Sequence, residues 1–217
     1  MSISVLLADD HAVVRDGLRS LLEIQPDIVV VGDAANGRVA VELVAKLAPN
    51  VAIVDITMPE LNGIDATYQM RQISPTTEII ILSMHANKSH VGRALQAGAR
   101  GYLIKESAGI EVVKAVRTVS AGHRYLSQTI SDAVIDDYLA NRNTSDHRSS
   151  LESLSVRERE VLQLVVEGRT SAEIAMILNL SPKTVESYRS RLMQKLNIGD
   201  LPSLVKFAIR EGLTPLE

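Results

Sequence analysis

The chain has 217 residues, 46% apolar and 23% charged, with a net charge of −3, which suits a soluble globular protein of one large or two modest domains. The absence of cysteine excludes disulfides, thiolate catalysis and cysteine-ligated zinc. Because there is no signal-peptide pattern and no apolar stretch near the roughly 20 residues that span a bilayer, we expect a cytoplasmic protein without a membrane partner.

The first half of the chain alternates short apolar runs with longer amphipathic stretches. The runs, which are typical of buried strands, are Ile3–Ala8, Ile28–Val31, Val51–Val54, Ile79–Leu82 and Gly101–Ile104. The stretches, which carry apolar residues at helical spacing, are Val13–Leu22, Val39–Leu47, Ala66–Ile73, Val91–Ala97 and Ile110–Ser120. These five β–α units predict an α/β fold: a five-stranded, doubly wound parallel sheet with helices on both faces.

A change of pattern separates the two halves. The strand pattern ends near Tyr125, and residues 141–150 contain no apolar side chain, which is typical of an exposed linker. We therefore expect one domain over residues 1–122, a linker over 123–150 with a short helix at 130–139, and a second domain over 151–217.

From residue 151 onward the apolar spacing is helical throughout, which predicts a small all-α domain. Ser155 and Glu158 form a capping-box pattern, and Gly168 ends the helix that this box begins. Three further helices are predicted over 171–178, from the Ser181-Pro182 pair onward, and over about 203–211. A short helix, a turn and a third, basic helix make a helix-turn-helix pattern.

Reactive side chains stand at the ends of four predicted strands. Asp9 and Asp10 follow the first strand, Asp55 the third, Ser83 the fourth and Lys105 the fifth. The carboxyl ends of parallel strands meet at one edge of the sheet, so these side chains are expected to converge there. A lone aspartate in such a place is more often a cap or turn residue, and a lone lysine is usually only solvated, but the ordered set indicates a site.

The chemistry of this set is that of phosphoryl transfer. Three clustered carboxylates repel one another unless a cation joins them, and Mg²⁺ prefers oxygen ligands and bridges to phosphoryl oxygens. One carboxylate is then free to attack phosphorus and form an acyl phosphate. Lys105 supplies a positive charge to the phosphoryl group and Ser83 a hydroxyl donor.

These residues resemble the receiver domain of response regulators, which has a flavodoxin-like fold. The resemblance covers roughly residues 1–122 and rests on Asp9-Asp10, Asp55-Ile-Thr-Met-Pro-Glu-Leu-Asn-Gly63, Ser83 and Gly101-Tyr-Leu-Ile-Lys105.

The resemblance implies a role for each matching residue. Asp55 is the phosphoacceptor and, with Asp9, Asp10 and the backbone carbonyl of Thr57, a Mg²⁺ ligand. Lys105 contacts the phosphoryl group. Such a chain accepts a phosphoryl group from a sensor histidine kinase and loses it slowly, rather than acting as an enzyme.

The resemblance also implies a switch pair, Ser83 and Tyr102. Ser83 moves toward the added phosphoryl oxygens, and Tyr102 turns inward to fill the space that it leaves. The alternative for Tyr102 is a half-buried strand aromatic with no switching role.

The third helix of the second domain is basic, although residues 151–217 carry nine basic and nine acidic residues and are formally neutral. From 182 to 196 it holds four basic residues and one acidic residue, which are Lys183, Arg189, Arg191, Lys195 and Glu186. Its predicted core stripe is Val185, Tyr188, Leu192 and Leu196. The charges are therefore expected to project outward, either as a solvated face or toward DNA phosphates.

The second domain resembles the LuxR-type DNA-binding domain over roughly residues 151–213. The matching segments are Leu154-Ser-Val-Arg-Glu-Arg-Glu-Val-Leu162, Gly168, Glu173-Ile-Ala175, Leu178, Ser181-Pro-Lys-Thr-Val185 and Lys195-Leu196. Two departures are Ser171-Ala172, where an Asn-Lys pair is frequent, and Tyr188, where His is frequent. With the receiver, the whole chain resembles the NarL/FixJ class of response regulators.

This second resemblance implies double-stranded DNA as a partner. Its expected phosphate contacts are Lys183, Thr184 and Arg191, with Arg189 as a further contact. The residues expected to face the groove are Glu186, Ser187 and Ser190. We expect a homodimer in the active state, because paired half-sites bring two copies together. The candidate dimer surface on the last helix is Leu204, Val205, Ala208 and Ile209, which could equally pack only inside the domain.

Two other classes compete with a phosphorylation-controlled transcription regulator. A haloacid-dehalogenase-like phosphatase or phosphotransferase also uses a strand-end aspartate and Mg²⁺, but its usual second acid is replaced here by Thr57. The other is a receiver used only for protein interaction, whose helix-turn-helix no longer binds DNA.

Overall fold

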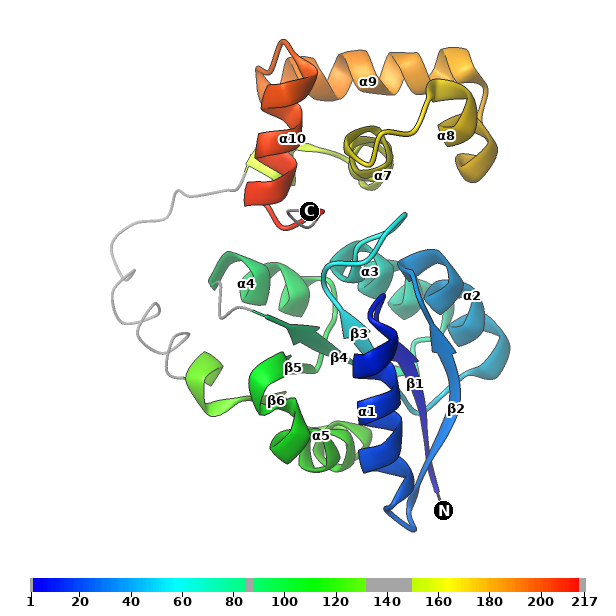
Figure 1. Cartoon of the computed structure of the whole chain (residues 1–217), viewed down its shortest axis with the longest axis vertical. Helices are drawn as coiled ribbons and strands as arrows, with labels where there is room; N and C mark the ends of the chain where they lie inside the picture. The colour runs from blue at the N-terminus through cyan, green and yellow to red at the C-terminus, as the bar shows by residue number, and fades with distance from the viewer. Residues whose placement is uncertain (1, 85–87, 132–149, 215–217) are drawn as a thin grey trace. The chain divides into compact units, whose positions relative to one another are not determined.

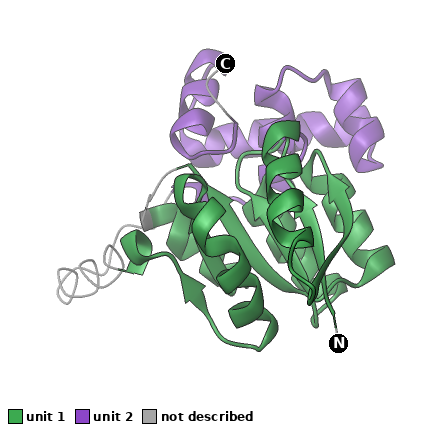
Figure 2. Cartoon of the chain, turned by 60° about the horizontal axis from the view of Figure 1, so that its bottom comes forward, with its two compact units in different colours: residues 1–58, 62–145 green, residues 59–61, 146–217 purple. Residues whose placement is uncertain are grey.

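The computed structural model describes residues 2–84, 88–131 and 150–214. The chain divides into two compact units, residues 1–58 with 62–145 and residues 59–61 with 146–217 (Figure 2). Most of the predicted linker, including all but the start of its predicted helix at 130–139, lies outside the described residues.

The first unit is built on one parallel sheet with the strand order β2-β1-β3-β4-β5-β6 (Figure 1). Its strands are β1 (Ile3–Ala8), β2 (Ile28–Ala34), β3 (Val51–Asp55), β4 (Glu78–Ser83), β5 (Gly101–Ile104) and β6 (Tyr125–Leu126). The chain passes from β1 to β2 and then back across β1 to β3. This reversal is the topological switch point, where open α/β sheets bind their ligands.

Helices cover both faces of the sheet. They are α1 (Ala12–Glu23), α2 (Gly37–Leu47), α3 (Gly63–Ile73), α4 (Lys88–Gln96) and α5 (Lys105–Ser120). Helices α1 and α5 contact each other and one face of the sheet, while α2 and α3 pack together on the other face and α3 also contacts α4. The predicted doubly wound architecture is therefore confirmed.

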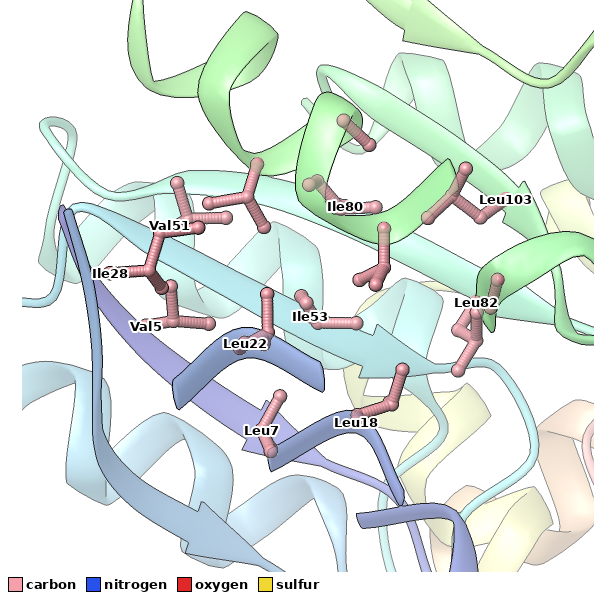
Figure 3. Packing of buried hydrophobic residues seen from close by; sticks show 14 of the residues in the cluster. Val5, Leu7, Leu18, Leu22, Ile28, Val51, Ile53, Ile80, Leu82 and Leu103 are labelled. Atoms are coloured by element: carbon pink, nitrogen blue, oxygen red, sulfur yellow. The ribbon is translucent and has the colours of Figure 1, made fainter. Parts of the chain in front are cut away.

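Side chains alternate between the two faces of the sheet along each strand, and both sets are apolar. Val5, Leu7 and Ile53 belong to the core cluster that α1 and α5 complete (Figure 3). Their strand neighbours Leu6 and Ala52 lie outside this cluster, yet they too are fully buried. A strand buried on both sides has a continuous apolar sequence, which is why these strands could be predicted from the sequence.

The prediction of a five-stranded sheet is wrong by one strand. Strand β6 begins at Tyr125, where the strand pattern was expected to end, and pairs in parallel with β5. A strand of two residues is too short to show a periodicity, so the sequence does not reveal it. By pairing with β5, it covers the edge of the strand that carries Tyr102, and the Ser127 amide donates to the Tyr102 carbonyl.

A close backbone approach fixes the loop that follows β3. The Gly63 amide donates to the carbonyl of Ile56 at 2.8 Å, and Asn62 caps α3 by accepting from the amides of Ile64 and Asp65. A Cβ atom at Gly63 would lie only 1.9 Å from the carbonyl oxygen of Asp55. Glycine at this position therefore lets α3 begin directly against the end of β3.

The second unit is all-helical, as predicted. Its elements are η1 (Ser150–Ser153), α7 (Val156–Val166), α8 (Ser171–Leu178), α9 (Pro182–Leu196) and α10 (Leu201–Arg210). Their inner faces form one core that includes Leu162, Ile174, Val185 and Phe207.

Local sequence signals set the helix boundaries of this unit. The capping box of Ser155 and Glu158 is present at the start of α7, and a second box, Thr170 with Glu173, begins α8. Ser181 caps α9 through the amide of Thr184. Each cap satisfies amides that a helix start leaves without a partner.

We predict that Gly63→Ala destabilises the first unit by about 1–3 kcal/mol, because the new methyl group meets backbone that cannot move aside without displacing α3. The measurement is chemical unfolding of the full chain. Gly109→Ala in α5 is the matched control, since its Cβ meets nothing within 4 Å and alanine favours a helix. Equal stability of the two variants would contradict the prediction.

Candidate functional site

Strand register brings the predicted acids and the lysine to one edge of the sheet. Ala8 pairs with Val54, so Asp9 and Asp55 are the next residues on neighbouring strands. Ser83 pairs with Ile104, which places Lys105 one residue beyond the same edge. The carboxyl ends of β1, β3, β4 and β5 therefore converge, as the sequence predicts.

Lys105 lies between two of these acids. Its ammonium Nζ is 2.8 Å from Oδ2 of Asp9 and 2.9 Å from Oδ2 of Asp55. The lysine side chain is 10% exposed and the two carboxylates less, so these ion pairs are shielded from water. Although burial opposes a charge on Lys105, Asp55 and Asp9 together hold the pKa of its ammonium above the usual value.

The site contains a further residue that was not predicted from the sequence, His11. Its Nδ1 is 2.7 Å from Oδ1 of Asp10 and 3.3 Å from Oδ1 of Asp9. Its backbone amide also donates to Asp9 at 2.9 Å. Its place directly after Asp9-Asp10 was the available signal. Arg15 supports the site from α1 by donating to the Asp9 carbonyl at 2.7 Å.

Burial gives Asp55 an unusual protonation equilibrium. Removal from water raises the pKa of this carboxyl to about 6, and Asp9 and Asp10 add to the rise while Lys105 opposes it. The neighbouring negative charges thus disfavour the ionised form of Asp55, which is the form able to attack phosphorus.

The acidic cluster fits a hard divalent cation. One ligand atom each from Asp9, Asp10, His11 and Asp55 lies within 4.8 Å of the others. Three carboxylates outnumber the single ammonium of Lys105, which leaves an excess of negative charge. Carboxylate oxygens in excess over nitrogen are the donor set that Mg²⁺ prefers. Thr57, whose carbonyl is the other predicted ligand, is half-buried two residues after Asp55.

The predicted switch pair also lies at this edge. Ser83 is 5% exposed at the end of β4, and Tyr102 on β5 is fully buried. Burial raises the pKa of Tyr102 to about 12, a hydrogen bond with Ser83 opposes the rise and the charge of Asp55 adds to it. The tyrosine ring thus already points inward in this structure. The alternative prediction for Tyr102 was a half-buried side chain, whereas the structure buries this side chain fully.

In the second unit, helix α9 presents a polar face. Val185 and Leu192 are buried in the core, as the predicted stripe requires. The predicted DNA contacts with exposed side chains on this helix are Lys183, Glu186, Ser187, Ser190 and Arg191. The guanidinium of Arg191 lies 6.0 Å from the ring centre of half-buried Tyr188.

The side chains of the other two predicted DNA contacts, Thr184 and Arg189, interact with residues of their own unit. The Thr184 hydroxyl lies 2.8 Å from the cap hydroxyl of Ser181. Arg189 is half-buried, with Nη1 3.7 Å from Oε1 of Glu186. Lys195 does not project freely from the helix, because its Nζ lies 2.7 Å from Oε2 of buried Glu158 on α7.

Two family models match the chain in the order of its two units. "Response regulator receiver domain" matches residues 5–117, and "Bacterial regulatory proteins, luxR family" matches residues 152–208. The first match covers most of the sheet and its edge site, and the second covers the helix-turn-helix.

Curated relatives match along their whole length. The response regulator UvrY of Escherichia coli (strain K12) is 40% identical, over 99% of this chain and 97% of its own. The transcriptional regulatory protein DegU of Brevibacillus brevis is 35% identical, over 97% of this chain and 94% of its own.

Solved structures agree with this assignment. The RcsB response regulator of Salmonella typhimurium matches with a TM-score of 0.59 and 29% identity, over 95% of this chain and 97% of its own. A structure of the two-component response regulator RcsB-DNA complex matches with a TM-score of 0.58 and 27% identity, over 95% of this chain and 98% of its own. The chain belongs to the NarL/FixJ class of DNA-binding response regulators of two-component systems, in which a receiver domain precedes a LuxR-type domain.

Within the part of the chain that the structure describes, no helix combines the length and the hydropathy needed to cross a bilayer.

We predict that Asp55→Asn stabilises the metal-free protein by about 1–3 kcal/mol at pH 7.5, because it replaces a buried charge with a neutral group of the same shape. The pKa of Asp55 is raised on folding, so its contribution to stability is fully present below about 3.8 and is lost as the pH rises through about 6. The difference between parent and variant should therefore shrink at pH 5. Thermal unfolding in a chelator at both pH values measures it.

Asp27→Asn is the control for this prediction. A hydrogen bond from Arg117 holds the pKa of exposed Asp27 below its usual value, so this variant should be less stable than the parent at pH 7.5. A destabilised Asp55→Asn variant, or a gain that is the same at both pH values, would reject the account of Asp55.

Proposed function

We propose that Asp55 accepts a phosphoryl group from a partner sensor histidine kinase, in the presence of Mg²⁺, and that this modification raises the affinity of helix α9 for DNA. The observation that supports it is the joint placement of Asp55, Asp9, Asp10 and Lys105 at the switch point of the sheet.

The acceptor chemistry follows from the charges of these residues. An oxygen of the Asp55 carboxylate attacks phosphorus, the new oxygen–phosphorus bond forms, and the bond to the donor breaks with its electron pair on the leaving group. Lys105 is near enough to Asp55 to offset charge on the phosphoryl oxygens. Mg²⁺, held by Asp9, Asp10, Asp55 and the Thr57 carbonyl, neutralises the remaining negative charge when bound. With no second acid at position 57, we expect only slow loss of the phosphoryl group.

The switch is proposed to start at Ser83. A phosphoryl group on Asp55 brings strong acceptor oxygens beside this buried hydroxyl, which draws Ser83 away from Tyr102. Tyr102 is the buried neighbour that loses its hydrogen bond to Ser83, since the two residues occupy adjoining strands. Phosphorylation therefore selects the arrangement in which Tyr102 is packed inward without its hydrogen bond to Ser83.

The output is proposed to be made by α9 in the major groove. Lys183, Thr184 and Arg191 contact phosphates, with Arg189 beside them, and these contacts fix the register on the duplex. The residues proposed to approach base edges are Glu186, Ser187 and Ser190.

The active protein is proposed to be a homodimer on paired half-sites. Of the candidate surface on α10, Leu204 and Ala208 are buried in the core of their own unit. They pack inside the unit, so we leave them out of the proposed dimer surface. Val205 and Ile209 are only half-buried and remain as the contribution of α10 to that surface.

Incubation with acetyl phosphate and Mg²⁺ should add one phosphoryl mass to the intact chain, and Asp55→Asn should remove the addition. Intact-protein mass spectrometry measures it. Asp16→Asn, which changes an exposed acid of α1, should be labelled like the parent. Labelling of the Asp55 variant at the parent level would show that another residue is the acceptor.

Replacing both Lys183 and Arg191 by alanine should lower the affinity for DNA at least about 10-fold at moderate salt, because each removes a cation near the phosphates. A gel-shift titration measures the affinity, and circular dichroism checks that the helices remain. Lys206→Ala, which changes an exposed lysine of α10, is the control and should bind like the parent. Unchanged binding by the double variant would reject α9 as the reading helix.

A further inference from the structure

The reading helix carries one acid, Glu186, among four basic residues. Its side chain is 60% exposed, so the core of the unit does not require it. A carboxylate near a DNA backbone is repelled by the phosphates, unless it is neutralised within the protein or accepts a hydrogen bond from a base. The contacts around Glu186 show the first of these, because Arg189 lies beside its carboxylate.

Glu186 is tied to the preceding helix. Ser171, the first residue of α8, donates a hydrogen bond from its Oγ to Oε1 of Glu186. Arg189 Nη1 donates to the same serine Oγ at 3.4 Å and lies 3.7 Å from Oε1 of Glu186. These three side chains, which we call the Ser171 cluster, join the start of α8 to one flank of α9.

The contacts of the Ser171 cluster involve one of the two carboxylate oxygens of Glu186. Oε1 of Glu186 takes the contacts from Ser171 and Arg189, and Oε2 is the other acceptor of a side chain that is 60% exposed. In the major groove, the amine at N4 of cytosine is the donor to which glutamate is matched. Arg189 lowers the repulsion from phosphates by pairing with the same carboxylate.

We propose that Ser171 is a positioning residue that holds the Glu186 carboxylate in the orientation that accepts from a cytosine, and so sets a base preference at one position of each half-site. This inference rests on the proposed placement of α9 in the major groove. A serine hydroxyl on a short side chain restricts an exposed glutamate that otherwise samples several rotamers. Less side-chain entropy is then lost on binding, and the gain is specific to the base that Glu186 contacts.

The test uses the full chain and double-stranded DNA. Sequences that the parent binds are selected from a randomised pool, and affinities are then measured for all four bases at each half-site position. The variants are Ser171→Ala, Ser171→Thr, Glu186→Ala and Glu186→Gln. Ser203→Ala, another serine in the first turn of a helix, is the matched control.

We expect Glu186→Ala to abolish the cytosine preference at one position and Glu186→Gln to move it toward adenine. Ser171→Ala should weaken the preference at that same position by about 3- to 10-fold, which is the size of the contribution of one ordinary hydrogen bond. Its affinity for random DNA and the salt dependence of that affinity should not change, because no cation is removed. Ser171→Thr should retain the cytosine preference, since threonine keeps the hydroxyl.

Three results overturn parts of the proposal separately. If Glu186→Ala removes the cytosine preference and Ser171→Ala leaves it intact, Ser171 has no positioning role. If Ser171→Ala lowers affinity for every sequence equally, its role is structural. If Glu186→Ala changes no base preference while the Lys183 and Arg191 double variant still loses binding, the function of α9 stands and the assignment of Glu186 fails.

Discussion

The ammonium of Lys105 lies within 3 Å of carboxylate oxygens of both Asp9 and Asp55, at the edge where β1, β3 and β5 end. Without this charge, buried carboxylates would repel one another in a region that water does not screen. The pair of contacts also sets the geometry of the site, because it holds the ends of non-adjacent strands to one point. The pKa of Asp55 and the fit of a divalent cation both depend on this arrangement.

The sequence predicted where these side chains gather, because the fold itself collects residues at strand ends. Strands buried on both faces leave long apolar runs, and the polar residue that ends each run is easy to see. Asp9, Asp55, Ser83 and Lys105 needed no knowledge of side-chain contacts to be grouped. His11 was missed because its interaction with Asp10 depends on a turn that an apolar pattern does not describe.

Other features could not be read from the sequence, for physical reasons. Strand β6 has two residues, too few to show alternation, and it exists because β5 offers a free edge for pairing. The bonds from Lys195 to Glu158 and from Ser171 to Glu186 join residues 37 and 15 positions apart on different helices. Such contacts follow from how helices pack and not from local propensity. They change the interpretation of α9, whose cations are not all directed at a ligand.

The two units are proposed to have different roles, one receiving the signal and the other binding DNA. The proposed phosphoryl group on Asp55 would change the charge of the edge site of the sheet, whereas α9 has a capped start and packs on the core of the helical unit. Coupling between them is a free energy, and it is measurable as a change in DNA affinity. Asp55, the group proposed to receive the signal, and the side chains proposed to read DNA belong to different units.

Coupling between Asp55 and α9 is measured as the affinity of the full chain for a selected DNA sequence, by fluorescence anisotropy with Mg²⁺ and with or without acetyl phosphate. We expect the phosphoryl donor to strengthen binding by the parent at least about 5-fold and to have no effect on Asp55→Asn. An equal response of parent and variant, or a parent whose affinity does not change on full phosphorylation, would contradict it.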